Sequence, residues 1–161
     1  MAKIIILDGF VANPGDLSWE PLAQLGELTV HEYTAPQDVV ARIGDAPIIL
    51  TNKTVITAEV LDACPSVKLV GELATGYNNI DTKYCKEKGI VVEAYSPFGT
   101  GTIFDVPEMK ALSEKYGKSV GQICLRWCLQ MGFVSLPKSS NPKRIRENLD
   151  IFDFALQEED V

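Results

Sequence analysis

Basic side chains gather near the end of the sequence, where nine residues contain Lys138, Lys143, Arg144 and Arg146. They flank the predicted end of a strand and the first turn of a predicted helix that Asn141 caps. Backbone N–H groups and the positive end of the helix dipole attract anions at such a turn, and Lys and Arg add charge-assisted donors. One hypothesis is therefore a phosphate or sulfate site. The alternative is a solvated charged surface that binds nothing.

Candidates for nucleophilic or acid–base chemistry are few. Asp8 follows the first predicted strand, at the edge where open α/β sheets keep their ligand sites, but a single carboxylate there more often hydrogen-bonds a loop. Ser139 and Ser140 have no histidine near them in sequence, and the single histidine, His31, falls at the end of the second predicted strand. The sequence therefore predicts no catalytic residue.

Metal ligands are not indicated either. The four cysteines have no CxxC spacing, and one histidine without a carboxylate cluster does not make a zinc site. Cys124 and Cys128 are four residues apart in a helical pattern, which is typical of small core residues on one helix face.

Strand and helix patterns alternate along the whole chain. We expect strands over 3–7, 27–33, 47–51, 67–73, 90–95 and 133–137. We expect helices over 16–25, 35–44, 57–63, 79–88, 107–116, 119–130 and 142–149, with a frayed tail at 157–161. This alternation favours a three-layer, flavodoxin-like, doubly wound α/β fold with a parallel sheet in the order 2-1-3-4-5-6. A complete eight-stranded barrel needs about 250 residues.

Length and charge bound the remaining possibilities. A chain of 161 residues buries roughly 69% of its surface on folding, which suits a single domain over 1–161. The net charge of −7 argues against nucleic-acid or membrane partners, and the longest apolar runs are too short to span a bilayer. We expect a soluble, cytoplasmic monomer or homodimer that requires no partner, with a small anion as a possible ligand.

The first half carries the motifs LTNKTVITAEVL at 50–61 and LATGYNNID at 73–81. With the segment at 7–34, they make residues 1 to about 82 resemble the substrate domain of the D-2-hydroxyacid dehydrogenases, in particular the glycerate dehydrogenase branch. The resemblance implies a flavodoxin-like unit. In it, backbone N–H groups of Thr75 and Gly76 would hold a substrate carboxylate, and Asn52 and Lys53 would line the same cleft.

The second half carries YCKEKGIVVEAYSPFGTG at 84–101, KYGKSVGQICLRWCLQMG at 115–132 and LPKSSNPKRIRENLDIFDF at 136–154. These motifs make residues from about 84 to 161 resemble the C-terminal quarter of the aldo-keto reductase (β/α)8 barrel. The resemblance implies a remnant cofactor site. Nicotinamide would stack on Tyr95, and the diphosphate would lie by Ser96 and Phe98. The adenosine 2′-phosphate would be held by Lys138, Ser139 and Arg144, with Glu147 and Asn148 near the adenine.

The two families have different folds. Both have a sequence similar to KGIVV before a strand, so we expect the junction between the two fragments near 82–92. We interpret the chain as an engineered chimera: a designed scaffold without native catalytic function, since no GxGxxG follows a strand and the catalytic residues of both families belong to other segments. No cofactor is required on this interpretation. Weak NADP, phosphate or sulfate binding through 138–148 is the alternative, and a truncated oxidoreductase is the third hypothesis.

Overall fold

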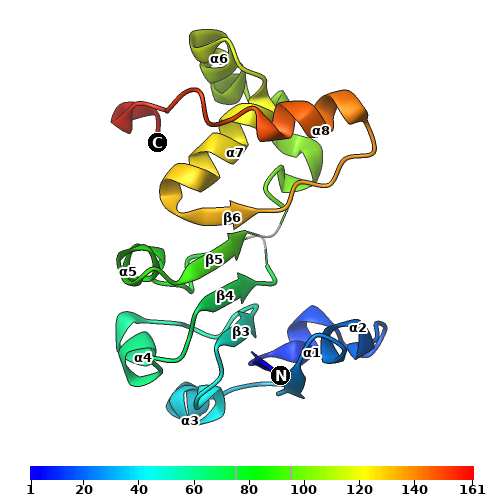
Figure 1. Cartoon of the computed structure of the whole chain (residues 1–161), viewed down its shortest axis with the longest axis vertical. Coiled ribbons are helices and arrows are strands. Elements are labelled where there is room, and N and C mark those ends of the chain that lie inside the picture. Colours follow the sequence, from blue (N-terminus) through cyan, green and yellow to red (C-terminus); the bar gives the residue numbers. More distant parts are fainter. Residues whose placement is uncertain (75, 95) are drawn as a thin grey trace. The chain divides into compact units, whose positions relative to one another are not determined.

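The computed structural model describes residues 1–74, 76–94 and 96–161, and Figure 1 shows their helices and strands. The chain divides into two compact units, unit 1 (Met1–Glu93) and unit 2 (Ala94–Val161). The six strands, numbered along the sequence, lie in the order 2-1-3-4-5-6, so the predicted order and the doubly wound α/β class are confirmed. The single domain with a junction near 82–92 stays a prediction.

The sheet of unit 1 consists of β1 (Lys3–Ile6), β2 (Glu27–Val30), β3 (Ile48–Thr51), β4 (Leu69–Glu72) and β5 (Val91–Ala94). All four strand pairings are parallel. Their register places Ile5, Ile49, Val70 and Val92 in one row across four strands, and each of these side chains is at most 7% exposed. β-branched residues pack well on such a surface, so this row forms the centre of the core.

Short helices connect these strands: α1 (Gly9–Ala12), α2 (Glu20–Ala23), α3 (Val39–Ile43, after a 3-10 turn at Pro36–Asp38), α4 (Ala58–Ala63) and α5 (Thr82–Lys88). In Figure 1, α3, α4 and α5 lie on one side of the strands of unit 1. The prediction of a helix over 16–25 is wrong, because only α2 forms there. The Asn13 side chain accepts from the N–H groups of Gly15 and Leu17 and donates to the Leu17 carbonyl, which holds this stretch as a loop.

Unit 2 contains a 3-10 segment (Gly99–Asp105), α6 (Pro107–Tyr116), α7 (Val120–Met131), β6 (Phe133–Ser135), α8 (Pro142–Leu149) and a 3-10 turn (Glu158–Asp160). Ser119 and Gln122 form a reciprocal capping box at the start of α7. The Gln122 amide also donates to the Asp150 carbonyl at 2.7 Å, which ties α7 to the chain after α8. Gly132 ends α7 with φ 88°, a backbone conformation that suits glycine.

The prediction of a frayed tail is wrong, because side chains of α6 and α7 hold it. The Trp127 indole N–H donates to the Val161 carbonyl at 3.0 Å. Lys115 forms an ion pair with Asp160 at 2.7 Å, and the Tyr116 hydroxyl donates to the same carboxylate. These contacts join residues 34 to 45 positions apart in the sequence, so no local pattern reveals them.

The four cysteines are free and buried, two in each unit: Cys64, Cys85, Cys124 and Cys128. Burial raises the pKa of the Cys85 and Cys124 thiols to about 11, so both stay protonated near neutral pH. Among the helices of the described residues, none has the length and apolar character needed to cross a membrane.

Candidate functional site

The carboxyl edge of unit 1, where β1, β3 and β4 end, is organised around Asp8. This residue is 3% exposed. Its carboxylate accepts from the backbone N–H groups of Asn52 at 2.8 Å, Lys53 at 2.5 Å and Thr54 at 2.7 Å. The hydroxyls of Thr54 and Thr51 donate to it at 3.1 and 3.4 Å. Asp8 therefore fixes the loop after β3. This agrees with the expectation that a single carboxylate at this edge more often hydrogen-bonds a loop.

This loop brings two predicted cleft residues to the edge. Asn52 is 9% exposed, and its side-chain amide donates to the Leu73 carbonyl at 3.3 Å, so it bridges the ends of β3 and β4. Lys53 is exposed. Of the loop expected to hold a carboxylate, Gly76 is exposed, whereas Thr75 lies outside the described residues.

Sequence reasoning missed Glu72, the last residue of β4. It is 5% exposed, and Oε1 accepts from the Ala74 N–H at 2.9 Å. Burial is the main reason that the pKa of this carboxyl rises to about 7. A glutamate that ends the otherwise apolar stretch of Leu69–Glu72 was the only signal in the sequence.

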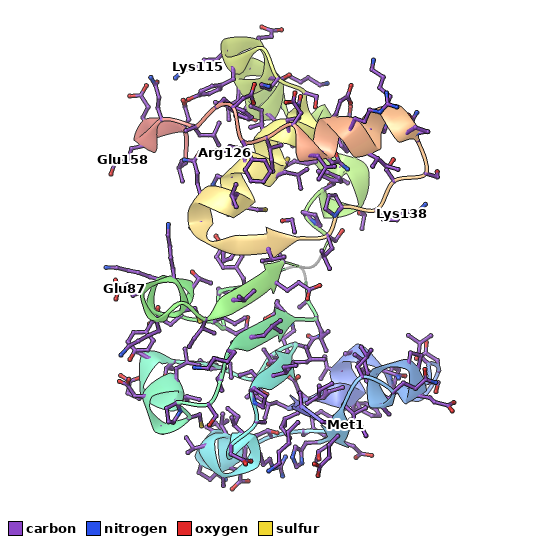
Figure 2. The ribbon with its side chains drawn as sticks, viewed as in Figure 1. Met1, Glu87, Lys115, Arg126, Lys138 and Glu158 are labelled. Carbon is purple, nitrogen blue, oxygen red and sulfur yellow. The ribbon has the colours of Figure 1, made fainter. Side chains whose placement is uncertain are left out.

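In unit 2, the predicted basic cluster is spread along the chain: Lys138 lies between β6 and α8, Lys143 and Arg144 lie on the first turn of α8, and Arg146 lies on its last turn. Figure 2 shows the labelled Lys138 side chain on the outside of unit 2. Lys138 and Arg144 are exposed and form no ion pair among the described residues, whereas Lys143 faces Glu147 at 3.8 Å. Arg146 is likewise exposed and forms no ion pair among these residues, so the cluster offers three cationic groups to an anion.

The backbone of this turn does not contribute as expected. The Asn141 side chain accepts from the N–H groups of Lys143 at 2.9 Å and Arg144 at 3.4 Å, and Pro142 has no N–H. The Asn141 N–H itself donates to the Ser139 hydroxyl at 3.2 Å. The expectation that free N–H groups after Asn141 face an anion is therefore wrong, because the cap already uses them.

Unit 2 also has an apolar hollow of about 550 Å³. Side chains from α7, β6 and α8 line it, and Asn148 is one of its few polar residues. Pro137 and Ile145, the neighbours of Lys138 and Arg144 in sequence, belong to the lining. Lys138 and Arg144 are not themselves lining residues.

Two further predicted cofactor residues are Tyr95 and Ser96. Tyr95 lies outside the described residues. Ser96 has φ 48°, and its hydroxyl accepts from the Thr100 N–H at 3.2 Å. Phe98 packs its ring against Phe104 with the centroids 5.6 Å apart. In the described part of the chain, no three histidine, cysteine, aspartate or glutamate side chains are grouped to hold a metal ion.

The open parallel sheet with flanking helices defines a doubly wound α/β fold, in which ligand crevices generally form outside the carboxyl ends of the strands. Residues 5–100 match the D-isomer specific 2-hydroxyacid dehydrogenase catalytic domain, and residues 77–161 match the aldo/keto reductase family. The chain belongs to both families, the first through its N-terminal part and the second through its C-terminal part. The two matches share residues 77–100.

Individual relatives agree with this division. Hydroxypyruvate reductase of Blautia hydrogenotrophica is 48% identical over 104 residues, which are 63% of this chain and 32% of that protein. Glyoxal reductase of Bacillus subtilis is 50% identical over 78 residues, which are 48% of this chain and 28% of that protein. The chain thus matches about a third or less of the length of either relative.

A solved structure shows a similar fold. The crystal structure of MGS-M4, an aldo-keto reductase from a Medee basin deep-sea metagenome library, gives a TM-score of 0.58 at 24% identity. The superposition covers 99% of this chain and 56% of that one. At this identity the likeness concerns the fold alone.

The family matches confirm the two-part composition of the chain. The interpretation as a designed scaffold without native catalytic function is wrong, because both parts are closely similar to proteins named as reductases. The relationship to oxidoreductases is therefore retained, and the designed origin is dropped.

Proposed function

We propose that this chain is an oxidoreductase-type protein that binds NADP(H) through unit 2. The observation that carries the proposal is the apolar hollow with Asn148 in its lining, together with the exposed cations Lys138 and Arg144, each of which is adjacent in sequence to a lining residue. A flat heteroaromatic base suits an apolar hollow with one amide, and a phosphate suits a lysine–arginine pair.

The donor set fits the phosphorylated form of the cofactor. Lys138 and Arg144 supply charge to a 2′-phosphate, and the Arg144 guanidinium can bind two phosphate oxygens at once. Asn148 can pair with the edge of an adenine. NADPH, when bound, supplies a hydride to a carbonyl carbon.

Both named relatives suggest the class of substrate. Hydroxypyruvate and glyoxal are small molecules with two adjacent oxidised carbons, and we propose this class for the chain. The cation Lys53 and the amide Asn52 at the carboxyl edge of unit 1 have the chemistry to bind the acidic or carbonyl oxygens of such a compound.

The test is a fluorescence titration of the full chain with NADPH and with NADH. We expect NADPH to bind at least about tenfold more tightly, which is about 1.4 kcal/mol. Arg144→Ala should remove this preference, whereas Lys110→Ala, which deletes an exposed charge on α6, should retain it. The preference should also shrink at high salt, because these charges are exposed.

Activity is tested in parallel by NADPH oxidation with hydroxypyruvate or glyoxal. Equal affinity for NADPH and NADH in the unmodified chain, or no binding of either at millimolar concentration, would overturn the cofactor proposal. NADPH binding without turnover of either compound would overturn the proposed substrate class.

A further inference from the structure

β2 (Glu27–Val30) lies at one end of the strand order, so one of its edges faces no other strand. The N–H groups of Glu27 and His31 donate to carbonyls of the 2–6 segment at 2.9 and 2.8 Å. In a parallel ladder, alternate residues bond the same neighbouring strand, so the N–H and C=O groups of Leu28 and Val30 point away from β1. Among the described residues, these groups have no backbone partner. Such a row of unpaired groups is a template for a further strand.

A second copy of the chain offers the same edge. A two-fold axis perpendicular to the sheet places the β2 strands of two copies side by side and antiparallel. Because Leu28 and Val30 have the outward groups, three short registers pair them: Leu28 opposite Leu28, Val30 opposite Val30, or Leu28 opposite Val30. The third register alone sets Glu27 of one copy opposite His31 of the other, and the two-fold axis makes this pair twice. In the other two registers, Glu27 faces an uncharged side chain.

A carboxylate opposite an imidazole is a complementary pair. Glu27 is exposed and His31 is half-buried, so both can be reached from outside the single chain. The carboxylate accepts hydrogen bonds, and the imidazole has an N–H donor in its neutral and in its charged form. Complementary side chains directly opposite each other stabilise a pair of strands. The sequence of β2 and the residue after it therefore selects one register for two copies.

The same register brings exposed apolar side chains together. Leu28 of one copy faces Val30 of the other, and Val30 is 37% exposed in the single chain. Continued past the strand, the register sets Leu25 beside Tyr33, which are 71% and 58% exposed. Thr29 is exposed and faces its own counterpart on the two-fold axis. A strand of 4 residues makes a contact smaller than the about 1,200 Å² of stable complexes, so this dimer forms at micromolar concentrations or above.

We propose that the free edge of β2 binds β2 of a second copy of this chain in antiparallel orientation, with Leu28 and Val30 exchanging their backbone hydrogen bonds. The sheets of the two copies of unit 1 then form one continuous sheet, and the exposed edge of each is covered. This inference concerns unit 1 and does not depend on cofactor binding by unit 2.

The first test is a cross-link that depends on the register. Thr29 forms a non-hydrogen-bonded pair with its counterpart, with the Cα atoms about 4.5 Å apart, which suits a disulfide. The four native cysteines are buried, so mild oxidation of Thr29→Cys with diamide should link two copies through the introduced thiols. In either alternative register these thiols are offset by two residues. Gln37→Cys is the control, because it places an exposed thiol of unit 1 outside β2.

Non-reducing electrophoresis of the full-length variants measures this cross-link, and mass spectrometry of the linked peptides identifies it. We expect Thr29→Cys to form the covalent dimer at least about tenfold faster than Gln37→Cys, whose rate reports random collisions.

The second test is the association of the chain itself, measured by sedimentation velocity from about 10 µM to 1 mM. Thr29→Lys sets two like charges opposite each other on the two-fold axis, so its association constant should fall at least about tenfold. Gln37→Lys adds the same charge at an exposed position outside β2 and should dimerise like the unmodified chain. Far-UV circular dichroism checks that both variants fold.

A chain that stays monomeric at about 1 mM would overturn the proposal, and so would equal rates of cross-linking at positions 29 and 37. A dimer that Thr29→Lys leaves unchanged would use another surface and would overturn it as well. The cross-linking comparison decides the matter even where Thr29→Lys does not fold.

Discussion

Asp8→Asn should be among the most damaging isosteric changes in unit 1. The carboxylate accepts three backbone N–H groups at 2.5 to 2.8 Å in a site that is 3% exposed. An asparagine replaces one oxygen by an NH2 group, which confronts at least one of these N–H groups with another donor. A buried donor left unsatisfied costs about 1–3 kcal/mol, and the bonds that remain lose their charge-assisted part. The expected loss in the free energy of unfolding, from the unsatisfied donor and the weakened bonds together, is about 3–5 kcal/mol.

The free energy of unfolding in urea, followed by far-UV circular dichroism, measures this loss. Asp45→Asn is the control, because it makes the same chemical change at an exposed carboxylate that pairs with Lys3 at 2.6 Å. Exposed pairs contribute little, so this variant should scarcely move the unfolding midpoint. A loss below about 1 kcal/mol for Asp8→Asn, or one equal to that of Asp45→Asn, would refute the assignment of Asp8 as the organiser of the edge.

Three further outcomes are expected. Gln122→Ala removes the capping box and the bond to the Asp150 carbonyl, so thermal unfolding should show a loss of about 1–3 kcal/mol; an unchanged melting temperature would contradict this. Gly26→Ala would place a Cβ 2.3 Å from the Ala2 carbonyl oxygen, so the start of β1 and β2 should be disturbed at a cost of about 1–3 kcal/mol or more, measured in urea. Burial, and then the charge of Arg42, lower the pKa of His31 below 6.5. The unfolded chain therefore binds more protons than the folded one, and the free energy of unfolding should fall as the pH drops below 6.5. His31→Gln should weaken this pH dependence, and an identical pH profile in the variant would exclude a contribution from His31.

Features set by neighbouring residues could be predicted from the sequence. Asn141 caps α8 as expected. Thr57 caps α4, and Gly89, Gly117 and Gly132 end their helices in left-handed conformations, which are positions typical of these residue types. Strand order followed from the alternation of strands and helices, because right-handed crossovers leave few arrangements. The basic cluster was predictable for the same reason, since its members are close in sequence.

Features that depend on distant residues were not predictable. The raised pKa of Glu72 reflects its burial and the charge of Asp8, and Asp8 is far from it in sequence. The same holds for the bond from the Trp127 indole N–H to the Val161 carbonyl, which joins residues 34 positions apart. The Asn141 cap illustrates a different limit. Its sequence motif predicts the start of α8, but the same side chain accepts from the first-turn N–H groups and so makes them unavailable to an anion.

The buried cysteines offer an internal probe of local opening. Cys64 and Cys85 belong to unit 1, and Cys124 and Cys128 belong to unit 2. An alkylating reagent reaches a buried thiol only during transient unfolding of the surrounding structure. Mass spectrometry of the labelled peptides would therefore give two opening free energies from one sample. If the two pairs were modified at different rates, the halves of the chain would exchange as separate cooperative units; a common rate would show that they open together.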